Sequence, residues 1–291
     1  MIRRKLGWTC VDVPVIGQGT WMIEGGGGGR DNDRHIYELA IKSLQTGLDL
    51  GMAHINTAEM YGNGIVENLV GQAIMGRREE VFLVSKVLPS NASYEGTLKA
   101  CERSLKRLKT DWLDLYLLHW PSSQHPIRET MRAMEKLVKE GLVKFIGVSN
   151  FDLEELKEAE AVLQNEKIAC NQVLYHLNSR GIERKLLPYC NSKDISIVGY
   201  SPFGHGNFPL SNSNKGHLLA EIAKRHQKTS QQVILNFIVN HTKILTIPKT
   251  NHPDHVKQNS ESIGWNLTKN EIADINMAFP VPMHDVPLDM I

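Results

Sequence analysis

The sequence predicts an α/β fold in which eight parallel strands alternate with helices and close into one (β/α)8 barrel, the TIM barrel architecture. Most of its short β-rich apolar runs are continuous rather than alternating, as expected for parallel strands that are buried on both faces. The segments between the runs have helical periodicity, and a regular alternation of strands and helices favours a parallel barrel. The number of runs also fits, because they start near Val15, Ala53, Val81, Leu113, Val143, Ile168, Ile195 and Ile244.

The helices between these runs are predicted from spacing and from capping residues. Asp152 with Glu155 predicts the start of the helix after the fifth run, and Thr268 with Glu271 predicts a capping box before the last helix. Apolar residues recur at helical spacing after the third and fourth runs, at Leu98, Cys101, Leu105 and Leu108 and at Ile127, Met131, Met134 and Leu137.

One domain is expected, because 291 residues is an ordinary length for a single barrel and no segment resembles a linker. We expect residues 1–291 to form this barrel with an N-terminal extension and a short C-terminal tail. A doubly wound open sheet is the alternative, disfavoured because no G-x-G-x-x-G follows the first strand. Two longer loops are expected at the C-terminal ends of the strands, Glu24–Asp33 and Phe203–Gly216. The glycine run in the first is interpreted as a plain solvated loop rather than a mobile flap.

Composition narrows the classes of function. With 41% hydrophobic and 22% charged residues, the chain fits a globular protein with a large core. A net charge of +1 gives no electrostatic reason to expect nucleic acid or an anionic membrane as a partner. The four cysteines form no C-x-x-C pair, so neither a disulfide framework nor a metal site is expected. No apolar segment near the N-terminus indicates a signal peptide, so we expect a cytoplasmic protein. We also expect it to be monomeric or weakly oligomeric and to act on a small molecule.

Polar side chains stand at or just past the end of every predicted strand. Because the carboxyl ends of parallel barrel strands meet on one face, these residues are expected to form a polar ring there. In strand order they are Thr20, Asn56, Lys86, His119, Ser149 with Asn150, Asn171 with Gln172, Tyr200 with Ser201, and Lys249 with Thr250.

Tyr61, Lys86 and His119 suit the protonation of a carbonyl oxygen. The pKa of a free phenol is about 10, and a neighbouring ammonium favours phenolate and so lowers that pKa. Taken singly, each residue has a plainer interpretation: a packing tyrosine, a solvated lysine at a strand end, and a core imidazole. The three come from consecutive βα units, however, so a shared site is the better interpretation.

The ordered motifs resemble those of the aldo-keto reductases. The similarity runs from about Leu6 to Phe279 and is carried by "VIGQGTW", "HINTAEMYGN", "LVSKV", "LYLLHWP", "GVSNF", "NQV", "GYSPFG" and "IPKTNHPDHVKQN". The resemblance implies a (β/α)8 barrel that binds NADPH or NADH across its C-terminal face. It also implies reduction of an aldehyde or ketone to an alcohol, or the reverse, with Tyr61 as general acid aided by Lys86 and His119.

Asn56 departs from this family pattern, which has an aspartate at the second strand end. The amide can still accept a hydrogen bond from Lys86, but it brings no negative charge. We therefore expect the cofactor to bind and turnover to be lowered. Natural divergence, a laboratory substitution and a non-catalytic member remain open, and the laboratory substitution is favoured because the other three residues are kept.

The resemblance also implies contacts to the cofactor. The residues expected around the nicotinamide, its ribose and the pyrophosphate are Ser149, Asn150, Gln172, Tyr200, Thr20, Trp21, Asn56, Ser201 and Phe203. Lys249 and Thr250 would meet the adenosine 2′-phosphate beside the helix that starts near Pro253. His255 replaces the usual arginine and Gln258 the usual glutamate, while Asn259 fits. NADPH is the first choice and NADH stays possible.

The substrate pocket is expected to be apolar and open. Trp21, Met22, Trp120 and Phe203 are the candidate walls, and small aldehydes, ketones or sugar-derived carbonyls are admissible. Two alternatives to the reductase remain. One is a non-catalytic NADP-binding sensor or scaffold subunit on the same barrel. The other is a lyase or isomerase that uses Lys86 as a Schiff-base amine.

Overall fold

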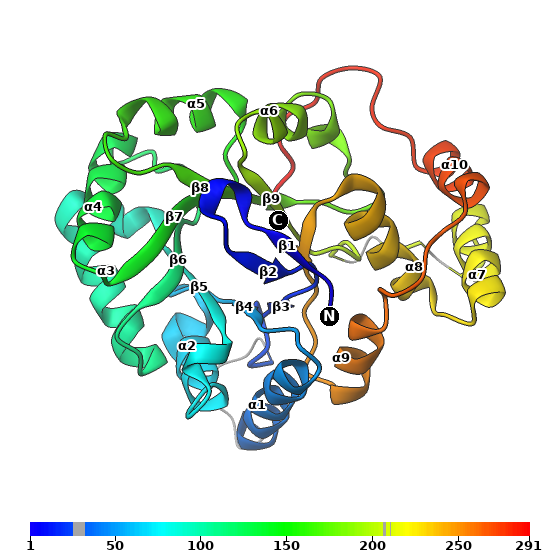
Figure 1. Cartoon of the computed structure of the whole chain (residues 1–291), viewed down its shortest axis with the longest axis horizontal. Coiled ribbons are helices and arrows are strands. Elements are labelled where there is room, and N and C mark those ends of the chain that lie inside the picture. Colours follow the sequence, from blue (N-terminus) through cyan, green and yellow to red (C-terminus); the bar gives the residue numbers. More distant parts are fainter. Residues whose placement is uncertain (26–32, 206–207, 210) are drawn as a thin grey trace.

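Eight parallel strands in sequential order form the central sheet of the computed structural model (Figure 1), which describes residues 1–25, 33–205, 208–209 and 211–291. Each strand pairs with the next strand along the chain, as expected when every connection carries a helix back over the sheet. The strands are β3 (Gln18–Gly19), β4 (His54–Asn56), β5 (Phe82–Val87), β6 (Leu113–Leu118), β7 (Val143–Ser149), β8 (Ile168–Leu174), β9 (Ser196–Tyr200) and β10 (Leu245–Ile247).

The sheet closes on itself between its first and last strands. Parallel bridges join Ile16 to Thr246 and Gly19 to Lys249, and Gly19 N donates to Pro248 O over 3.1 Å. A Cβ on Gly19 would lie 2.5 Å from the carbonyl oxygen of Ile247, so this close approach needs glycine. Closure confirms the predicted barrel, and the alternative of a doubly wound open sheet is wrong.

Helices surround the barrel, and α7 and α10 lie farthest from its axis (Figure 1). Both predicted capping boxes are present, at Asp152 with Glu155 and at Thr268 with Glu271. The helices are α1 (Asp33–Asp49), α2 (Ile65–Ala73), α3 (Tyr94–Leu108), α4 (Ile127–Lys139), α5 (Leu153–Val162), α6 (Leu186–Ser192), α7 (Asn214–His226), α8 (Ser230–Asn236), α9 (Pro253–Ser260) and α10 (Lys269–Ala278).

An antiparallel hairpin, β1 (Arg3–Lys5) with β2 (Asp12–Pro14), lies across one end of the barrel. Trp8 Nε1 donates to the carbonyl oxygen of Ile168 over 3.1 Å, and Gly7 N donates to Ser196 Oγ over 2.7 Å. Ile168 and Ser196 are the first residues of β8 and β9. The hairpin therefore covers the N-terminal ends of the strands, and the C-terminal ends are left for a site.

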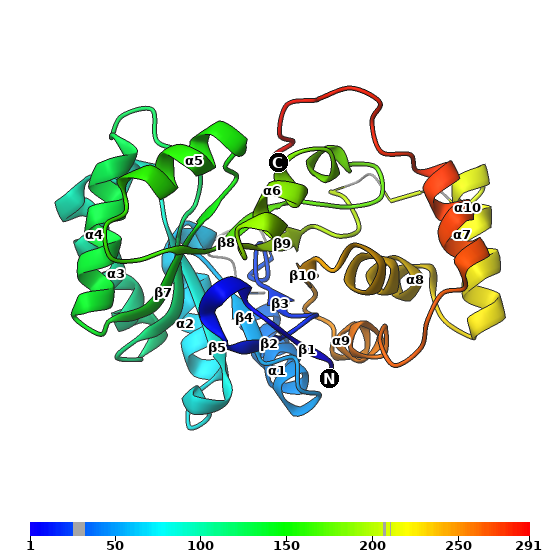
Figure 2. The ribbon, with the colours of Figure 1, turned by 45° about the horizontal axis from the view of Figure 1, so that its top comes forward.

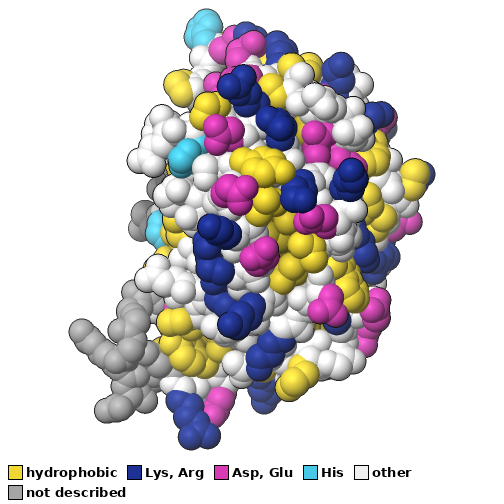
Figure 3. All heavy atoms as spheres, turned by 90° about the vertical axis from the view of Figure 1, so that its left-hand side faces the viewer, with side chains coloured by type: hydrophobic (Ala, Val, Ile, Leu, Met, Phe, Trp, Pro, Cys, Tyr) yellow, Lys and Arg dark blue, Asp and Glu magenta, His cyan; other side chains and the backbone are white. Residues whose placement is uncertain are grey.

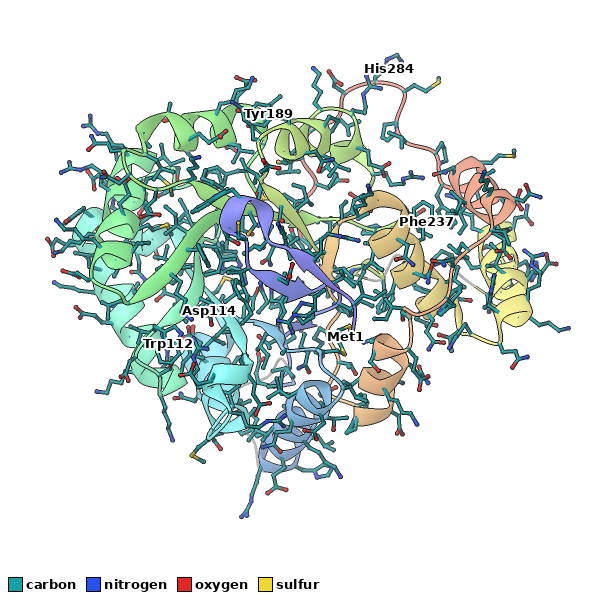
Figure 4. The ribbon with its side chains drawn as sticks, in the orientation of Figure 1. Met1, Trp112, Asp114, Tyr189, Phe237 and His284 are labelled. Atoms are coloured by element: carbon teal, nitrogen blue, oxygen red, sulfur yellow. The ribbon has the colours of Figure 1, made fainter. Side chains whose placement is uncertain are left out.

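A buried carboxylate ties three strands together on the outer side of the barrel. Asp114 on β6 accepts hydrogen bonds from Arg78 Nη2 at 2.8 Å, Lys144 Nζ at 2.9 Å and Leu83 N at 3.0 Å. Trp112 lies beside Asp114 (Figure 4), and the Arg78 guanidinium stacks 4.4 Å from its ring centroid. Because the charge of Asp114 is compensated from two neighbouring segments, this cluster stabilises the strand order.

The chain returns over the barrel after α10 (Figure 2). Asp285 pairs with Arg184 Nε at 2.9 Å, and Asp289 Oδ2 accepts from Ser179 Oγ at 2.6 Å. These contacts hold the C-terminal segment against the connection between β8 and α6. The segment is therefore packed onto the barrel on its way to the mouth.

The two predicted loops are only partly covered by the described residues. Residues 26–32, with the glycine run, and residues 206–207 and 210 lie outside them. The second loop is shorter than expected, because α7 begins at Asn214 with Ser213 as its cap.

The surface over α3 to α5 carries interspersed acidic and basic side chains around apolar ones (Figure 3). Among the residues the structure describes, no helix has the length and apolarity needed to cross a membrane.

Candidate active site

The polar strand ends open onto one cavity at the C-terminal end of the barrel. Most of the residues predicted for the site line it: Thr20, Trp21, Asn56, Tyr61, His119, Trp120, Ser149, Asn150, Gln172, Tyr200, Ser201 and Lys249. Parallel strands deliver these side chains together because their carboxyl ends share one rim. Most of the predicted polar ring therefore forms one concave surface. Lys86, Asn171 and Thr250 do not line it, and the Asn171 side chain instead bonds the backbone of Phe151.

Lys86 lies directly beneath the cavity and is fully buried. Its Nζ donates to Asn56 Oδ1 and to the carbonyl oxygen of Thr57, both at 2.7 Å, and lies 3.4 Å from Tyr61 Oη. Burial lowers the pKa of Lys86 to about 7, although Cys170 and Glu67 favour its charged form. Lys86 therefore changes charge near neutral pH. Because it has no exposed surface, a substrate carbonyl cannot reach it as a Schiff-base partner.

Tyr61 and His119 converge at the same place. Tyr61 opens a 3₁₀ turn after β4, and the two rings pack edge to face with centroids 5.6 Å apart. Burial, with a smaller effect of Tyr200, raises the pKa of Tyr61, which is opposite to the expected lowering by Lys86. Burial and Lys86 hold the pKa of His119 well below its usual range. At neutral pH the site therefore presents a protonated phenol and a neutral imidazole.

Asn56 connects the lysine to the far side of the cavity. Its Oδ1 faces Lys86, while its Nδ2 donates to Gln172 Oε1 over 2.8 Å. Thr20 Oγ1 donates to the backbone carbonyl of Asn56 over 3.0 Å, which anchors this strand end. The contact with Lys86 that was expected for the amide is present, and the link to Gln172 was not anticipated.

A network of hydroxyl and amide groups lines the opposite wall. Tyr200 Oη donates to Asn150 Oδ1 over 2.8 Å, and Asn150 Nδ2 donates to the carbonyl oxygen of His119 over 3.0 Å. Ser149 Oγ donates to the Gln172 carbonyl over 2.9 Å. Asn150 and Ser201 both have left-handed backbone, with φ of 58° and 50°. Asn150 follows β7 and Ser201 follows β9, the two strands that flank β8, and strained backbone at such strand ends is typical of binding sites.

The residues predicted for the adenosine end lie around the start of α9. Lys249 is exposed at the cavity rim, and Thr250 Oγ1 accepts from His252 N over 3.1 Å. His255 and Gln258 are exposed on α9, whereas Asn259 is buried and lines a separate small cavity with Thr250. Only Lys249 is shared with the main cavity, so the other four can meet a ligand only where it extends past the rim.

Two of the expected apolar walls lie outside the cavity. Trp21 and Trp120 line it. Met22 is exposed with φ of 57°, and Phe203 packs on Phe208 with ring centroids 6.3 Å apart. The left-handed backbone of Met22 turns its own side chain away from the cavity, which an apolar sequence pattern does not reveal.

Four residues that line the cavity were not predicted: Gly19, Met60, Ile247 and Ile291. Met60 precedes Tyr61 and Ile247 ends β10, so position beside a strand end could have indicated both. Ile291 had no such signal, because a returning segment is placed by tertiary contacts. Its presence shows that the short tail reaches the cavity, and the open pocket expected from that tail stays a prediction.

The residues present suit a nicotinamide dinucleotide better than a metal. Gln172 Nε2 has no acceptor within the described part of the chain, and Lys249 offers a cation at the rim. An amide and an ammonium match the amide and phosphate groups of such a cofactor. No group of three potential metal ligands occurs among the residues described.

Comparison with known proteins gives a consistent family. A sequence profile of the Aldo/keto reductase family matches residues 15–278. The chain is 41% identical over 281 residues to methylglyoxal reductase YeaE of Escherichia coli (strain K12), covering 97% of this chain and 96% of that protein. It is 34% identical over 274 residues to glyoxal reductase of Bacillus subtilis (strain 168), covering 91% and 89%. The crystal structure of an aldo-keto reductase from Klebsiella pneumoniae in complex with NADPH has a TM-score of 0.91 at 38% identity, covering 100% of both chains.

Proposed function

We propose that this chain, which belongs to the aldo/keto reductase family, reduces small aldehydes and dicarbonyls such as methylglyoxal with NADPH. The observation that carries the proposal is the 3.4 Å approach of Lys86 Nζ to Tyr61 Oη at the cavity that His119 also lines. The relatives named for methylglyoxal and glyoxal reduction support the substrate class. The relative crystallised with NADPH supports the cofactor.

The proposed chemistry divides between cofactor and protein. Bound NADPH supplies a hydride, and the chain supplies position and a proton. Tyr61 is protonated at neutral pH and donates its proton to the carbonyl oxygen. Neutral His119 is placed to donate a hydrogen bond to the same oxygen and so orient it. Lys86, when charged, stabilises the phenolate that remains.

This arrangement favours reduction over alcohol oxidation near neutral pH. Reduction begins from protonated Tyr61, and burial keeps the phenol in that form. Oxidation would need the phenolate at the start, which becomes accessible only at higher pH. The proposal is therefore a carbonyl reductase in the forward direction.

The decisive variant is Tyr61→Phe. Removing the only proposed proton donor should lower kcat for methylglyoxal at least about 100-fold with little effect on NADPH binding. Oxidation of NADPH is followed by loss of its reduced-nicotinamide absorbance. Tyr189→Phe is the control, because Tyr189 lies on outer α6 and bonds Glu160 (Figure 4). Its kcat should stay within twofold, and equal rates for the two variants would contradict the proposal.

We also propose that Asn56 lowers turnover. The carboxylate usual in the family would keep Lys86 charged at neutral pH, whereas the amide leaves a lysine whose pKa is about 7. Asn56→Asp should therefore raise kcat at pH 7. An unchanged or lower kcat with intact cofactor binding would contradict this.

Asn56 also favours a second candidate, a non-catalytic NADP-binding sensor or scaffold subunit. Such a protein would bind NADPH without passing its hydride to a carbonyl. A single-turnover experiment separates the two, since a reductase oxidises bound NADPH when methylglyoxal is added and a sensor does not.

For its setting, we propose a cytoplasmic protein that is monomeric or weakly oligomeric. All four cysteines are free and three of them are buried, which suits a reducing compartment. Localisation of a tagged chain and sedimentation across concentrations test the two statements.

A further inference from the structure

Lys86 determines which of its neighbours at the base of the cavity donate hydrogen bonds and which accept them. An ammonium has three N–H donors and no acceptor, and a neutral amine still has two donors. Both atoms that lie 2.7 Å from Lys86 Nζ are therefore acceptors, the Thr57 carbonyl oxygen and Asn56 Oδ1. The Asn56 amide has only this orientation, because the reverse would place its NH2 against the lysine donors.

The orientation of Asn56 then fixes that of Gln172. With its oxygen turned to Lys86, Asn56 can present only its NH2 to Gln172, and Nδ2 lies 2.8 Å from Gln172 Oε1. Gln172 is 2% exposed and Asn56 is also 2% exposed, so water does not replace this bond. Gln172 consequently holds its own NH2 away from Asn56, on the side that lines the cavity.

We propose that Asn56 is a specificity-determining residue that acts through Gln172. By fixing the orientation of Gln172, it makes the Gln172 NH2 donate to the carbonyl oxygen of the nicotinamide carboxamide. The inference rests on the proposed NADPH-dependent function, because it assigns Gln172 to the nicotinamide end. Asn56 acts here as a positioning residue, distinct from its effect on Lys86. One buried amide thus links the proton-donating side of the site with the cofactor side.

An aspartate at position 56 would reverse the polarity. A carboxylate accepts from Lys86 and offers only a second acceptor to Gln172. Gln172 would have to turn its NH2 toward residue 56 and its Oε1 toward the cavity. The cavity would then offer an acceptor, which binds the NH2 of a carboxamide and repels a carbonyl oxygen.

A cofactor analogue distinguishes the two polarities. In 3-acetylpyridine adenine dinucleotide phosphate, a methyl ketone replaces the carboxamide, so the acceptor oxygen is kept and the NH2 is lost. The readout is the dissociation constant of the analogue divided by that of NADP+, measured by quenching of tryptophan fluorescence. Both ligands carry the same charge, so the ratio cancels the added negative charge in a variant.

Asn56→Asp should increase this ratio about 5- to 20-fold over the unaltered chain, the effect of one buried acceptor left unpaired. Gln172→Glu is the second variant. It keeps Asn56 and its hydrogen bond but places an acceptor in the cavity, so its ratio should rise in the same way. Agreement between the two variants would show that an acceptor facing the cavity, introduced from either residue, raises the ratio.

A ratio that changes less than twofold in both variants would overturn the inference while leaving the reductase proposal intact. A rise in Gln172→Glu alone would also overturn it, because Asn56 would then not set the polarity. Failure of NADP+ and NADPH to bind the unaltered chain would instead contradict the proposed function itself. Circular dichroism of each variant establishes that it is folded before its ratio is interpreted.

Discussion

Two neighbouring residues of β5 carry buried polar clusters on opposite faces of the same strand. Ser85 points outward and donates to Glu67 Oε1 over 2.6 Å, while Arg107 Nε approaches Glu67 Oε2 at 2.6 Å. Glu67 has no exposed surface, so its charge is compensated within the protein by a guanidinium and a hydroxyl. Such a cluster joins α2 and α3 to the barrel.

Lys86, the next residue, points inward and has no such compensation. Its nearest partners are an amide and a carbonyl oxygen, and within the described ranges no carboxylate forms an ion pair with it. Burial consequently lowers the pKa of Lys86 to about 7. The same strand therefore contributes to two different roles. At Ser85 it joins a compensated charge that supports the structure, and at Lys86 it carries an uncompensated charge that can change near neutral pH.

Among the variants of β5, Lys86→Met should lose the most activity. The variant removes the group that stabilises the phenolate of Tyr61, so kcat should fall at least about 100-fold. Stability should change less than in a Glu67 variant, because an uncompensated buried charge is removed along with its hydrogen bonds. Turnover kinetics and chemical denaturation measure both. A kcat within fivefold of the original would remove Lys86 from the mechanism.

The outer cluster should respond in the opposite way. Glu67→Gln leaves Arg107 without its charged partner and should lower the free energy of unfolding by about 2–3 kcal/mol. Its kcat per folded molecule should fall far less than that of Lys86→Met, because Glu67 favours the charged form of Lys86 only from a distance. Glu140→Gln is the control, since Glu140 pairs with Lys136 on an exposed face and should change stability by less than about 0.5 kcal/mol. Equal stability of the two variants would show that the buried cluster is not structural.

The smallest expected effect is a shift in pH dependence. Lys86 is charged below its folded-state pKa of about 7, so reduction should weaken as pH rises through that value. In Asn56→Asp the new carboxylate favours the ammonium, and this alkaline limb should move to higher pH by at least about one unit. The two proteins should therefore differ most above pH 7. Coincident limbs would mean that another group controls the profile.

Much of the architecture followed from local pattern. The continuous runs before Asn56, Lys86 and His119 mark strands whose ends must meet, and the two capping boxes are visible as residue pairs three apart. These features depend on neighbours in sequence, so periodicity and spacing are enough to predict them.

What escaped prediction depends on partners distant in sequence. The hydrogen bond between Asn56 and Gln172 joins residues 116 positions apart, and the approach of Ile291 to the cavity depends on contacts of a returning segment. The direction of the Tyr61 pKa shift follows from burial, which spacing does not reveal. Met22 turned outward because its backbone is left-handed, although its apolar side chain suggested a wall.

Gly19 belongs both to the closure of the barrel and to the wall of the cavity. The same residue forms the seam between the first and last strands and lines the cavity. A methyl group on residue 19 would clash with the carbonyl oxygen of Ile247. The first and last strands of the sheet would have to separate to relieve this clash. A larger residue at position 19 would therefore alter the cavity wall and weaken the closure of the barrel at the same time.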